Sequence, residues 1–404
     1  MNQQQPLKQQ QISASMPPFP SWPHFDEEEI AAVTTVLRSG RVNRWTGQEN
    51  VLFEQEFATF AGCRYAIAVA NGTVALELAL FALGIGPGDE VIVSSRTFIA
   101  SASAVFVRGA TPVVADIDPD SQNLSAATVR PLLTPRTRAI IAVHLAGWPC
   151  DMDPLLELAR AHDIKVIEDC AQAQGASYKG RPVGSLGDVA AFSFCQDKIM
   201  TTGGEGGMLT TNDPQIWQRA WAYKDHGKDY DTVFCGHSGA GFRWLHHSFG
   251  TNWRMTEMQA AIGRIALRKV PDWVVIRRRH AAVLTDVFRA IHGLRVTEPP
   301  AEVVHAYYKY YVFVEPAILP GPMTRDSIMT AITDAGVPCF SGSCSEIYRE
   351  KAFVEAGLSP CKRLPVARLL GETSLMFQVH PTLTDDHIAR TGMVVQAVIA
   401  PEIR

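Results

Sequence analysis

Seven short apolar runs between residues 65 and 211 constrain the fold of this chain more than any other feature of its sequence. They are YAIAVA (65–70), EVIVS (90–94), PVVAD (112–116), RAIIAV (138–143), KVIED (165–169), DVAAFSF (188–194) and GGMLTT (206–211). Plausible helices such as TVALELALFAL lie between most of them. Continuous apolar strands separated by helices are typical of a mostly parallel sheet buried on both faces. We therefore expect an α/β fold, with GGMLTT as an antiparallel member because it follows a glycine loop without a helix.

The pattern changes on both sides of this region. Residues 1–20 are rich in glutamine and predict a disordered tail. Thr256 and Gln259 fit a capping box at the start of the helical pattern TEMQAAIGRIALRK. A smaller α+β portion follows, with YYKYYVFVEP as a strand and PMTRDSIMTAITDAG as a helix. Because 404 residues exceed the usual size of one core, we expect a large domain over 21–270 and a small C-terminal domain over 271–404.

Charge and cysteine content narrow the class of protein. The net charge is −4 without a long basic run, so neither a nucleic acid nor an anionic membrane is expected as a partner. No apolar run reaches the roughly 20 residues that span a bilayer. The eight cysteines form no CxxC pair, and we interpret them as free thiols in a reducing compartment. These observations predict a cytoplasmic protein.

Several residues whose side chains could bind a ligand or take part in a reaction fall where the predicted strands end. In open parallel sheets, ligands bind beyond the carboxyl ends of the strands. The residues at these positions are Asn71, Gly72, Thr73, Phe98, Asp169, Ser193 and Lys198. Each also has an ordinary interpretation: a turn and helix cap for the Asn-Gly-Thr sequence, a loop or cap carboxylate for Asp169, a core position for Phe98 and a solvated surface position for Lys198.

Taken together, these residues match what pyridoxal phosphate requires. A lysine amine condenses with the aldehyde of the cofactor, and a carboxylate keeps the pyridine nitrogen protonated. An aromatic side chain covers the ring, and the amides at a helix start bind the phosphate. The glycines of TTGGEGG leave space close to Lys198. No dinucleotide or P-loop glycine motif is present, and the adjacent pair His246–His247 lacks metal-chelating helical spacing, so we predict no metal site.

Five longer segments resemble the DegT/DnrJ/EryC1/StrS aminotransferases, which act on sugars and belong to the aspartate aminotransferase superfamily. The resemblance covers roughly residues 20 to 385. It is carried by WTGQENVLFEQEFATFAG, ANGTVALELALFALGIGPGDEVIVSSRTFIA, VIEDCAQAQGASYKGRPVGSLGDVAAFSF, DKIMTTGGEGGM and GTNWRMTEMQAAIG. It implies fold type I of the pyridoxal-phosphate enzymes, with a mostly parallel seven-stranded sheet flanked by helices and a smaller C-terminal α+β domain.

The resemblance also implies roles for individual residues. Lys198 matches the lysine that holds the cofactor and moves a proton between the substrate Cα and the cofactor. The other matches are Asp169 with the ring nitrogen, Gln172 with the ring oxygen, Gly72, Thr73 and Ser193 with the phosphate, Phe98 with the ring face, and Asn252 with the phosphate of the neighbouring subunit. The last match implies a homodimer with shared active sites. Cys195 stands where the family commonly has histidine or an aromatic residue, and packing is its default interpretation.

The implied reaction is transfer of an amino group from L-glutamate to a ketone on a nucleotide-activated sugar. A glutamine-dependent aminotransferase of keto-cyclitols is a close alternative. A non-catalytic regulator that binds the cofactor and a nicotinamide-dependent dehydrogenase are rivals from other classes. The stretches 221–254 and 305–311 are candidate substrate walls, although they suit a dimer interface or a core equally well.

Overall fold

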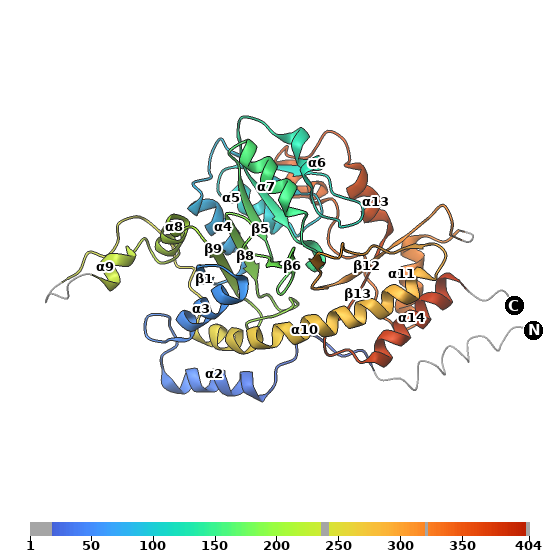
Figure 1. The fold of residues 1–404 in the computed structure, drawn as a ribbon, viewed down its shortest axis with the longest axis horizontal. Helices are drawn as coiled ribbons and strands as arrows, with labels where there is room; N and C mark the ends of the chain where they lie inside the picture. Colours follow the sequence, from blue (N-terminus) through green and yellow to red (C-terminus); the bar gives the residue numbers. More distant parts are fainter. Residues whose placement is uncertain (1–17, 236–241, 320–321, 401–404) are drawn as a thin grey trace, which may run out of the picture.

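The computed structural model describes residues 18–235, 242–319 and 322–400. Its largest sheet has seven strands in the order β1-β9-β8-β5-β4-β2-β3 (Figure 1). These strands are β1 (Tyr65–Val69), β2 (Glu90–Ser94), β3 (Thr111–Ala115), β4 (Thr137–Val143), β5 (Lys165–Asp169), β8 (Val189–Ser193) and β9 (Gly207–Thr211). Each of the seven apolar runs of the sequence supplies one strand, which confirms the predicted fold class.

β9 is the antiparallel strand of this sheet. It pairs antiparallel with β1, where Ile67 faces Leu209, and antiparallel with β8, where Phe192 faces Met208. The pairs β5–β8, β4–β5, β2–β4 and β2–β3 are all parallel. The loop between β8 and β9 contains no helix, and a short connection of this kind joins antiparallel strands. The sequence prediction for GGMLTT is therefore confirmed.

Helices cover both faces of the sheet because successive strand residues point to opposite sides. On one face the core includes Phe57, Met152 and Val270, which belong to α3 (Glu49–Ala61), α7 (Met152–Ala161) and α10 (Glu257–Arg289). On the other face it includes Leu78 and Val105, from α4 (Gly72–Ala82) and α5 (Ala100–Val107), together with α8 (Pro214–Lys224). The strand ends, rather than the strand faces, are therefore the parts of the sheet left open for a ligand.

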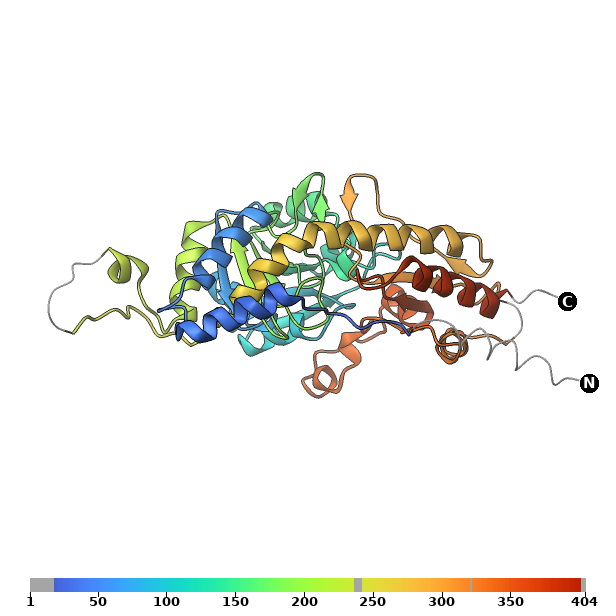
Figure 2. The same cartoon turned by 90° about the horizontal axis from the view of Figure 1, so that it is seen from below.

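One long helix, α10, runs from the sheet to the C-terminal part of the chain (Figure 2). It begins with the predicted capping box between Thr256 and Gln259. It is 33 residues long and continues through Pro271, whereas the sequence pattern indicated a helix that ends near Lys269. The predicted limit at residue 270 falls inside this helix, and the division into two domains stays a prediction.

The C-terminal part has a core and a small sheet of its own. β10 (Leu294–Arg295), β12 (Tyr310–Val314) and β13 (Ser374–Phe377) form an antiparallel sheet. α11 (Arg325–Asp334) and α14 (Asp385–Ile399) pack beside it, and α14 also contacts α10. The predicted strand and the predicted helix of this region are both present. Remaining elements are α2 (Glu27–Ser39), α6 (Ala126–Val129), α9 (Tyr230–Phe234), α12 (Lys351–Glu355), α13 (Pro365–Thr373), β6 (Ser177–Tyr178), β7 (Arg181–Pro182) and β11 (Val303–Val304).

Two further features bear on the sequence expectations. The predicted tail lies outside the described residues as far as residue 17. The segment that carries α9 extends away from the sheet in both ribbon views (Figures 1 and 2). Among the helices that the structure describes, none combines the length and apolar character needed to cross a membrane.

Candidate active site

A cavity of about 730 Å³ lies at the carboxyl ends of the strands. Seven of the eight residues to which the sequence assigned a cofactor role line it: Gly72, Thr73, Phe98, Asp169, Gln172, Ser193 and Lys198. The eighth, Asn252, has an exposed side chain and does not line this cavity within the single chain. Its predicted contact was with a neighbouring subunit, so that contact stays a prediction.

The start of α4 forms one wall of the cavity. Asn71 is its N-cap, and the Oδ1 atom of this residue accepts a hydrogen bond from the amide of Val74 over 3.0 Å. The asparagine therefore acts as the helix cap that turn chemistry favours. The first backbone N–H groups of a helix have no partner within the helix, which makes them suitable for an anion. Gly72 and Thr73 carry such groups and both line the cavity.

Gly72 permits α4 to approach the end of β8 closely. A Cβ atom at this position would lie 2.6 Å from Cβ and 3.0 Å from Cα of Ser193. Any other residue would therefore separate the helix start from Ser193. The glycine keeps a backbone amide and a serine hydroxyl on the same side of the cavity, and the Thr73 hydroxyl lies next to them in sequence.

Asp169 ends β5 with its carboxylate buried in the cavity wall. The hydroxyl of Ser101 donates a hydrogen bond of 2.8 Å to Oδ2, and the amide of Ala171 donates one of 3.1 Å to Oδ1. The hydroxyls of Ser101 and Thr97 are 2.9 Å apart and extend this network. Burial raises the pKa of Asp169, and the two hydrogen bonds oppose that rise. A cationic ring nitrogen would stabilise the charged carboxylate here.

Gln172 presents its amide nitrogen to the cavity. Its Oε1 atom accepts a hydrogen bond of 2.8 Å from the amide of Ala146, and that contact fixes the orientation of the side-chain amide. Ala146 adopts a left-handed conformation with φ of 59°, which lets its amide reach the glutamine. The two N–H groups on Nε2 are then the groups that Gln172 offers to a ligand, and they suit an oxygen substituent on a ring.

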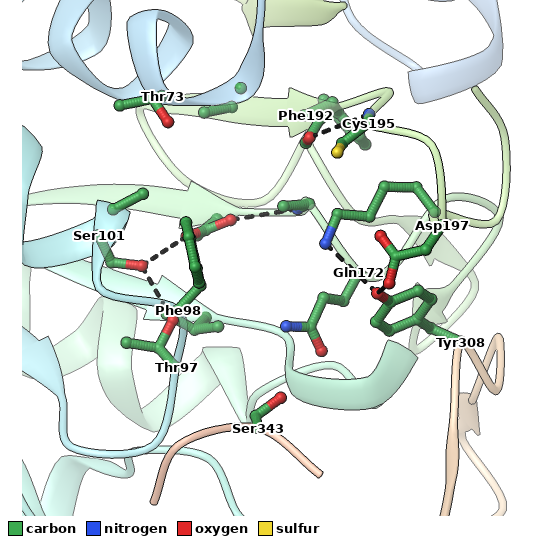
Figure 3. Close-up of a pocket in the computed structure, with 18 of the residues that line it drawn as sticks. Thr73, Thr97, Phe98, Ser101, Gln172, Phe192, Cys195, Asp197, Tyr308 and Ser343 are labelled. Carbon is green, nitrogen blue, oxygen red and sulfur yellow. Dashed lines mark hydrogen bonds between the residues drawn. The ribbon is translucent and has the colours of Figure 1, made fainter. Parts of the chain in front are cut away.

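Phe98 follows β2 and lies at the mouth of the cavity. Its side chain is 69% exposed, although phenylalanine is usually buried. The backbone next to it is fixed, because the amide of Thr97 donates to the carbonyl of Cys344 over 3.2 Å. In Figure 3, Phe98 and Ser101 lie on one side of the cavity, and Asp197 and Tyr308 lie on the opposite side. An exposed ring held at this position is suited to cover the face of a flat ligand.

Lys198 lies in the loop after β8. Its Nζ atom is 3.5 Å from the hydroxyl of Tyr308, and its backbone carbonyl accepts a hydrogen bond of 2.7 Å from Nε1 of Trp22. The glycine loop that follows has two left-handed residues, Gly203 with φ of 86° and Gly204 with φ of 116°. The loop thus turns back so that β9 pairs with β8 next to the lysine.

Cys195 also lines the cavity. Its Sγ atom is 4.0 Å from Oε1 of Glu205, and its backbone amide donates to the hydroxyl of Ser193 over 3.3 Å. The thiol is half-buried and makes no shorter polar contact among the described residues. The structure gives no reason to assign it a role beyond packing.

The C-terminal part completes the cavity with residues whose individual roles were not predicted. They are Tyr308, Lys309, Tyr311, Gly342, Ser343 and Met376. Three of them belong to the stretch 305–311, which the sequence named as a candidate wall. The other named stretch, 221–254, contributes no described residue to the lining. Asp197 and Ser101 line the cavity as well, and no sequence motif singled them out.

The described residues contain one group with metal-like spacing, made of His144, Glu168 and Cys170. Nε2 of His144 is 3.0 Å from Oε2 of Glu168, and Nδ1 accepts the amide of Cys150 over 3.0 Å. Both ring nitrogens are therefore engaged, and three backbone amides also donate to Glu168. His144 and Glu168 therefore belong to a satisfied hydrogen-bond network at the end of β5.

The donor set of the cavity fits pyridoxal phosphate. The primary amine of Lys198, the buried carboxylate of Asp169, the oriented amide of Gln172 and the exposed ring of Phe98 surround the same space. The helix start beside Gly72 offers backbone amides for a phosphate, and a Cβ atom at that position would push it away from Ser193. Each part of the cofactor, namely its aldehyde, ring nitrogen, ring oxygen, ring face and phosphate, therefore has a suitable group in the wall.

Comparisons with known proteins point in the same direction. The model of the DegT/DnrJ/EryC1/StrS aminotransferase family matches residues 23–398. GDP-perosamine synthase of Caulobacter vibrioides is 44% identical over 293 residues, which are 72% of this chain and 75% of that protein. UDP-N-acetyl-3-dehydro-alpha-D-glucosamine 3-aminotransferase of Acidithiobacillus ferrooxidans is 35% identical over 354 residues, 87% of this chain and 89% of that protein. The crystal structure of an aminotransferase from Psychrobacter cryohalolentis superimposes with a TM-score of 0.93 at 55% identity, covering 95% of this chain and 99% of that one.

Proposed function

The chain belongs to the DegT/DnrJ/EryC1/StrS aminotransferase family and is a sugar aminotransferase that depends on pyridoxal phosphate, and from that premise we propose its substrates and the roles of its residues. Its fold is fold type I of the pyridoxal-phosphate enzymes. The proposed reaction moves the amino group of L-glutamate to a ketone on a nucleotide-activated sugar. The observation that carries the proposal is the presence of Lys198, Asp169 and the start of α4 in the wall of one cavity.

Bound pyridoxal phosphate supplies an electron-withdrawing ring that stabilises negative charge on the substrate carbon. Lys198 holds the cofactor through its Nζ atom and, once released, takes a proton from the substrate carbon or returns one to it. Asp169 keeps a proton on the ring nitrogen, since a buried carboxylate is stabilised by an adjacent cation. Ser101 and the Ala171 amide hold that carboxylate in place.

The remaining lining residues bind and orient. The amides of Gly72 and Thr73, together with the hydroxyl of Ser193, bind the phosphate at the helix start. Gln172 donates from Nε2 to the ring oxygen, because its Oε1 atom is occupied by the Ala146 amide. Phe98 covers the ring face at the mouth of the cavity and excludes water from that side.

The substrate proposal is supported by the names of the relatives and by the size of the cavity. GDP-perosamine synthase and the UDP-N-acetyl-glucosamine aminotransferase both carry a nucleotide sugar in their names. A cavity of about 730 Å³ has the volume of a typical small-molecule site. Lys309 adds a cation to its wall beside Tyr308, a charge suited to the carboxylates of glutamate or to a diphosphate.

We also propose a homodimer in which Asn252 serves the neighbouring site. Its side chain is exposed in the single chain, and its backbone bridges to Asp225, where the segment that carries α9 leaves the end of α8. Its neighbours in that segment include the exposed side chains of Phe242, Trp244 and Phe249, which are 79%, 79% and 100% exposed. Exposed aromatic side chains on an extended segment are typical of a surface that contacts another chain.

A two-stage spectroscopic experiment tests this function. The visible absorption of the lysine-bound cofactor is followed while L-glutamate is added, and a panel of nucleotide ketosugars and keto-cyclitols is then added to the converted enzyme. We expect glutamate to abolish the absorption and one nucleotide ketosugar to restore it. Restoration by keto-cyclitols alone would refute the sugar-nucleotide assignment, and conversion by glutamine alone would refute the donor.

A further inference from the structure

Tyr308 is the hydrogen-bond partner of the Lys198 amine among the described residues. The Nζ atom of Lys198 donates to the hydroxyl of Tyr308 over 3.5 Å and lies 4.8 Å from the centroid of its ring. Such catalytic hydrogen bonds are often long before substrate binds. Asp169, by contrast, forms its hydrogen bonds with Ser101 and Ala171. The atom proposed to carry the proton is therefore in contact with a tyrosine that no sequence motif assigned to the reaction.

The hydroxyl of Tyr308 has a fixed direction. It donates its proton to Oδ2 of Asp197, so that its oxygen meets Lys198 as an acceptor. Burial raises the pKa of Tyr308 above its ordinary value, and the hydroxyl remains protonated. Although partial burial opposes it, the charge of Lys198 and the hydroxyl of Tyr308 hold the pKa of Asp197 below its ordinary value. Asp197 therefore stays an acceptor.

The rest of the surroundings hold this pair in place. Arg277, which is buried on α10, donates to the backbone carbonyl of Tyr308 over 3.2 Å. Nζ of Lys309 is 3.7 Å from Oδ2 of Asp197 and 4.6 Å from the centroid of the Tyr308 ring. Tyr308 and Asp197 face each other at one side of the cavity (Figure 3). The tyrosine thus reaches the lysine loop from the C-terminal part of the chain, just before β12.

We propose that Tyr308, oriented by Asp197, is a positioning residue that fixes the Lys198 amine for proton transfer while that amine is free of the cofactor. This inference rests on the proposed role of Lys198 as the proton carrier. A phenol oxygen that accepts one N–H leaves the nitrogen lone pair available to the substrate carbon. The amine becomes an ammonium when it takes that proton, and the Asp197 charge stabilises it through the shared hydroxyl. Within each half-reaction the ammonium passes that proton on, and the second half-reaction moves a proton in the reverse direction, so the amine ends as it began and the cycle gains and loses none.

The first test compares two tyrosines that differ by two positions in sequence. Tyr308→Phe removes the proposed hydroxyl. Tyr310→Phe is the matched control, because the Tyr310 hydroxyl is also buried but contacts Thr285 over 3.0 Å away from the cavity. We expect Tyr308→Phe to lower kcat of each half-reaction by roughly ten- to a hundredfold, with KM and cofactor content unchanged. An equal loss of kcat in Tyr310→Phe, or no loss in Tyr308→Phe, overturns the proposal.

A double-mutant cycle separates positioning from a structural effect. Lys198→Ala is assayed with added methylamine, which replaces the missing amine, and Tyr308→Phe is then introduced into that background. If the tyrosine acts through the lysine, the second substitution has no further effect on the rescued rate. A further loss equal to the loss in the wild-type background shows that Tyr308 acts independently of Lys198, and the proposal is wrong.

Competitive acylation tests the contact without the cofactor or any substrate. Cofactor-free protein is treated with a trace of acetic anhydride, and labelling of Lys198 is measured by mass spectrometry relative to other lysines. Without the Tyr308 hydroxyl, the protonated form of the Lys198 amine loses a hydrogen-bond acceptor, and the neutral form, which reacts with the anhydride, is favoured. Tyr308→Phe should therefore accelerate labelling of Lys198 by roughly two- to tenfold, while Tyr310→Phe leaves it unchanged. An unchanged rate in Tyr308→Phe contradicts the proposal. This measurement stands even if no donor converts the enzyme, an outcome that would refute the proposed function alone.

Discussion

The substitution Gly72→Ala tests whether the start of α4 is built to hold a phosphate. The added Cβ atom would meet Cβ of Ser193 at 2.6 Å, about 1 Å closer than an ordinary contact. The nearest atoms are Cβ and the backbone Cα of Ser193, so the strain falls on the end of β8 or on the helix start itself. Overpacking of this kind costs about 1–3 kcal/mol. Because the helix start is the proposed phosphate site, we expect that cost to appear in cofactor affinity.

A loss of about 1–3 kcal/mol corresponds to a dissociation constant for pyridoxal phosphate that rises roughly five- to 150-fold. Equilibrium titration of cofactor-free protein, followed by visible absorption, measures this constant. Gly86→Ala is the matched control, since a Cβ atom there would come no closer than 3.7 Å to the carbonyl of Arg108. Thermal melting of both cofactor-free variants separates affinity from stability. Wild-type affinity in Gly72→Ala would refute the assignment of the phosphate to this turn.

Three further predictions concern the ring nitrogen, the buried histidines and the subunit interface. Asp169→Asn should retain the cofactor but lower kcat roughly ten- to a thousandfold. A carboxylate raises the pKa of a neighbouring cation by about 1–3 units, so its loss should leave the ring nitrogen less protonated. An unchanged kcat would show that Asp169 is not the partner of the ring nitrogen. Burial lowers the pKa of His305 and of His380 to about 3. As the pH falls below about 6.5, these two histidines take up protons in the unfolded chain but stay neutral in the folded protein. The free energy of unfolding should therefore fall toward pH 3 by up to about 1.4 kcal/mol per pH unit for each histidine. Denaturant titrations should show a smaller change of this free energy with pH in His305→Phe than in the wild type. An identical change in the two proteins would contradict the lowered pKa of His305. Mixing inactive Lys198→Ala with Asn252→Ala under conditions of subunit exchange should restore activity, since one site of the hybrid dimer has both residues intact; no recovery in proven hybrids would place Asn252 outside the neighbouring site.

The large sheet was predictable because its strands are buried on both faces. Runs such as YAIAVA and VAAFSF are apolar or nearly so at successive positions, and the structure places each of them in the sheet. The length of α10 was less predictable. Pro271 interrupts the helical pattern just after Lys269, yet the helix continues because its buried residues, such as Leu284 and Phe288, pack in the C-terminal core. Tertiary packing of this kind outweighs the local cost of a proline within a helix.

The residues at strand ends were predictable as a group, since parallel strands bring their carboxyl ends to one edge. Residues as distant as Gly72 and Lys198 accordingly line one cavity. The contacts that orient them were not predictable. Ser101 reaches Asp169 across 68 positions of sequence, and Tyr308 reaches Lys198 across 110. No sequence motif marks either residue, so only the tertiary packing distinguishes Ser101 and Tyr308 from the other serines and tyrosines of the chain.

Reduction with borohydride tests the central claim, that one amine in this cavity holds the cofactor. The holoenzyme is reduced, digested and analysed by mass spectrometry for peptides that carry the cofactor mass. We predict a single modified site at Lys198, and no modified site when the enzyme carries Lys198→Ala. Modification at a different lysine, or a Lys198→Ala enzyme that still transfers nitrogen at the wild-type rate without added amine, would contradict the account.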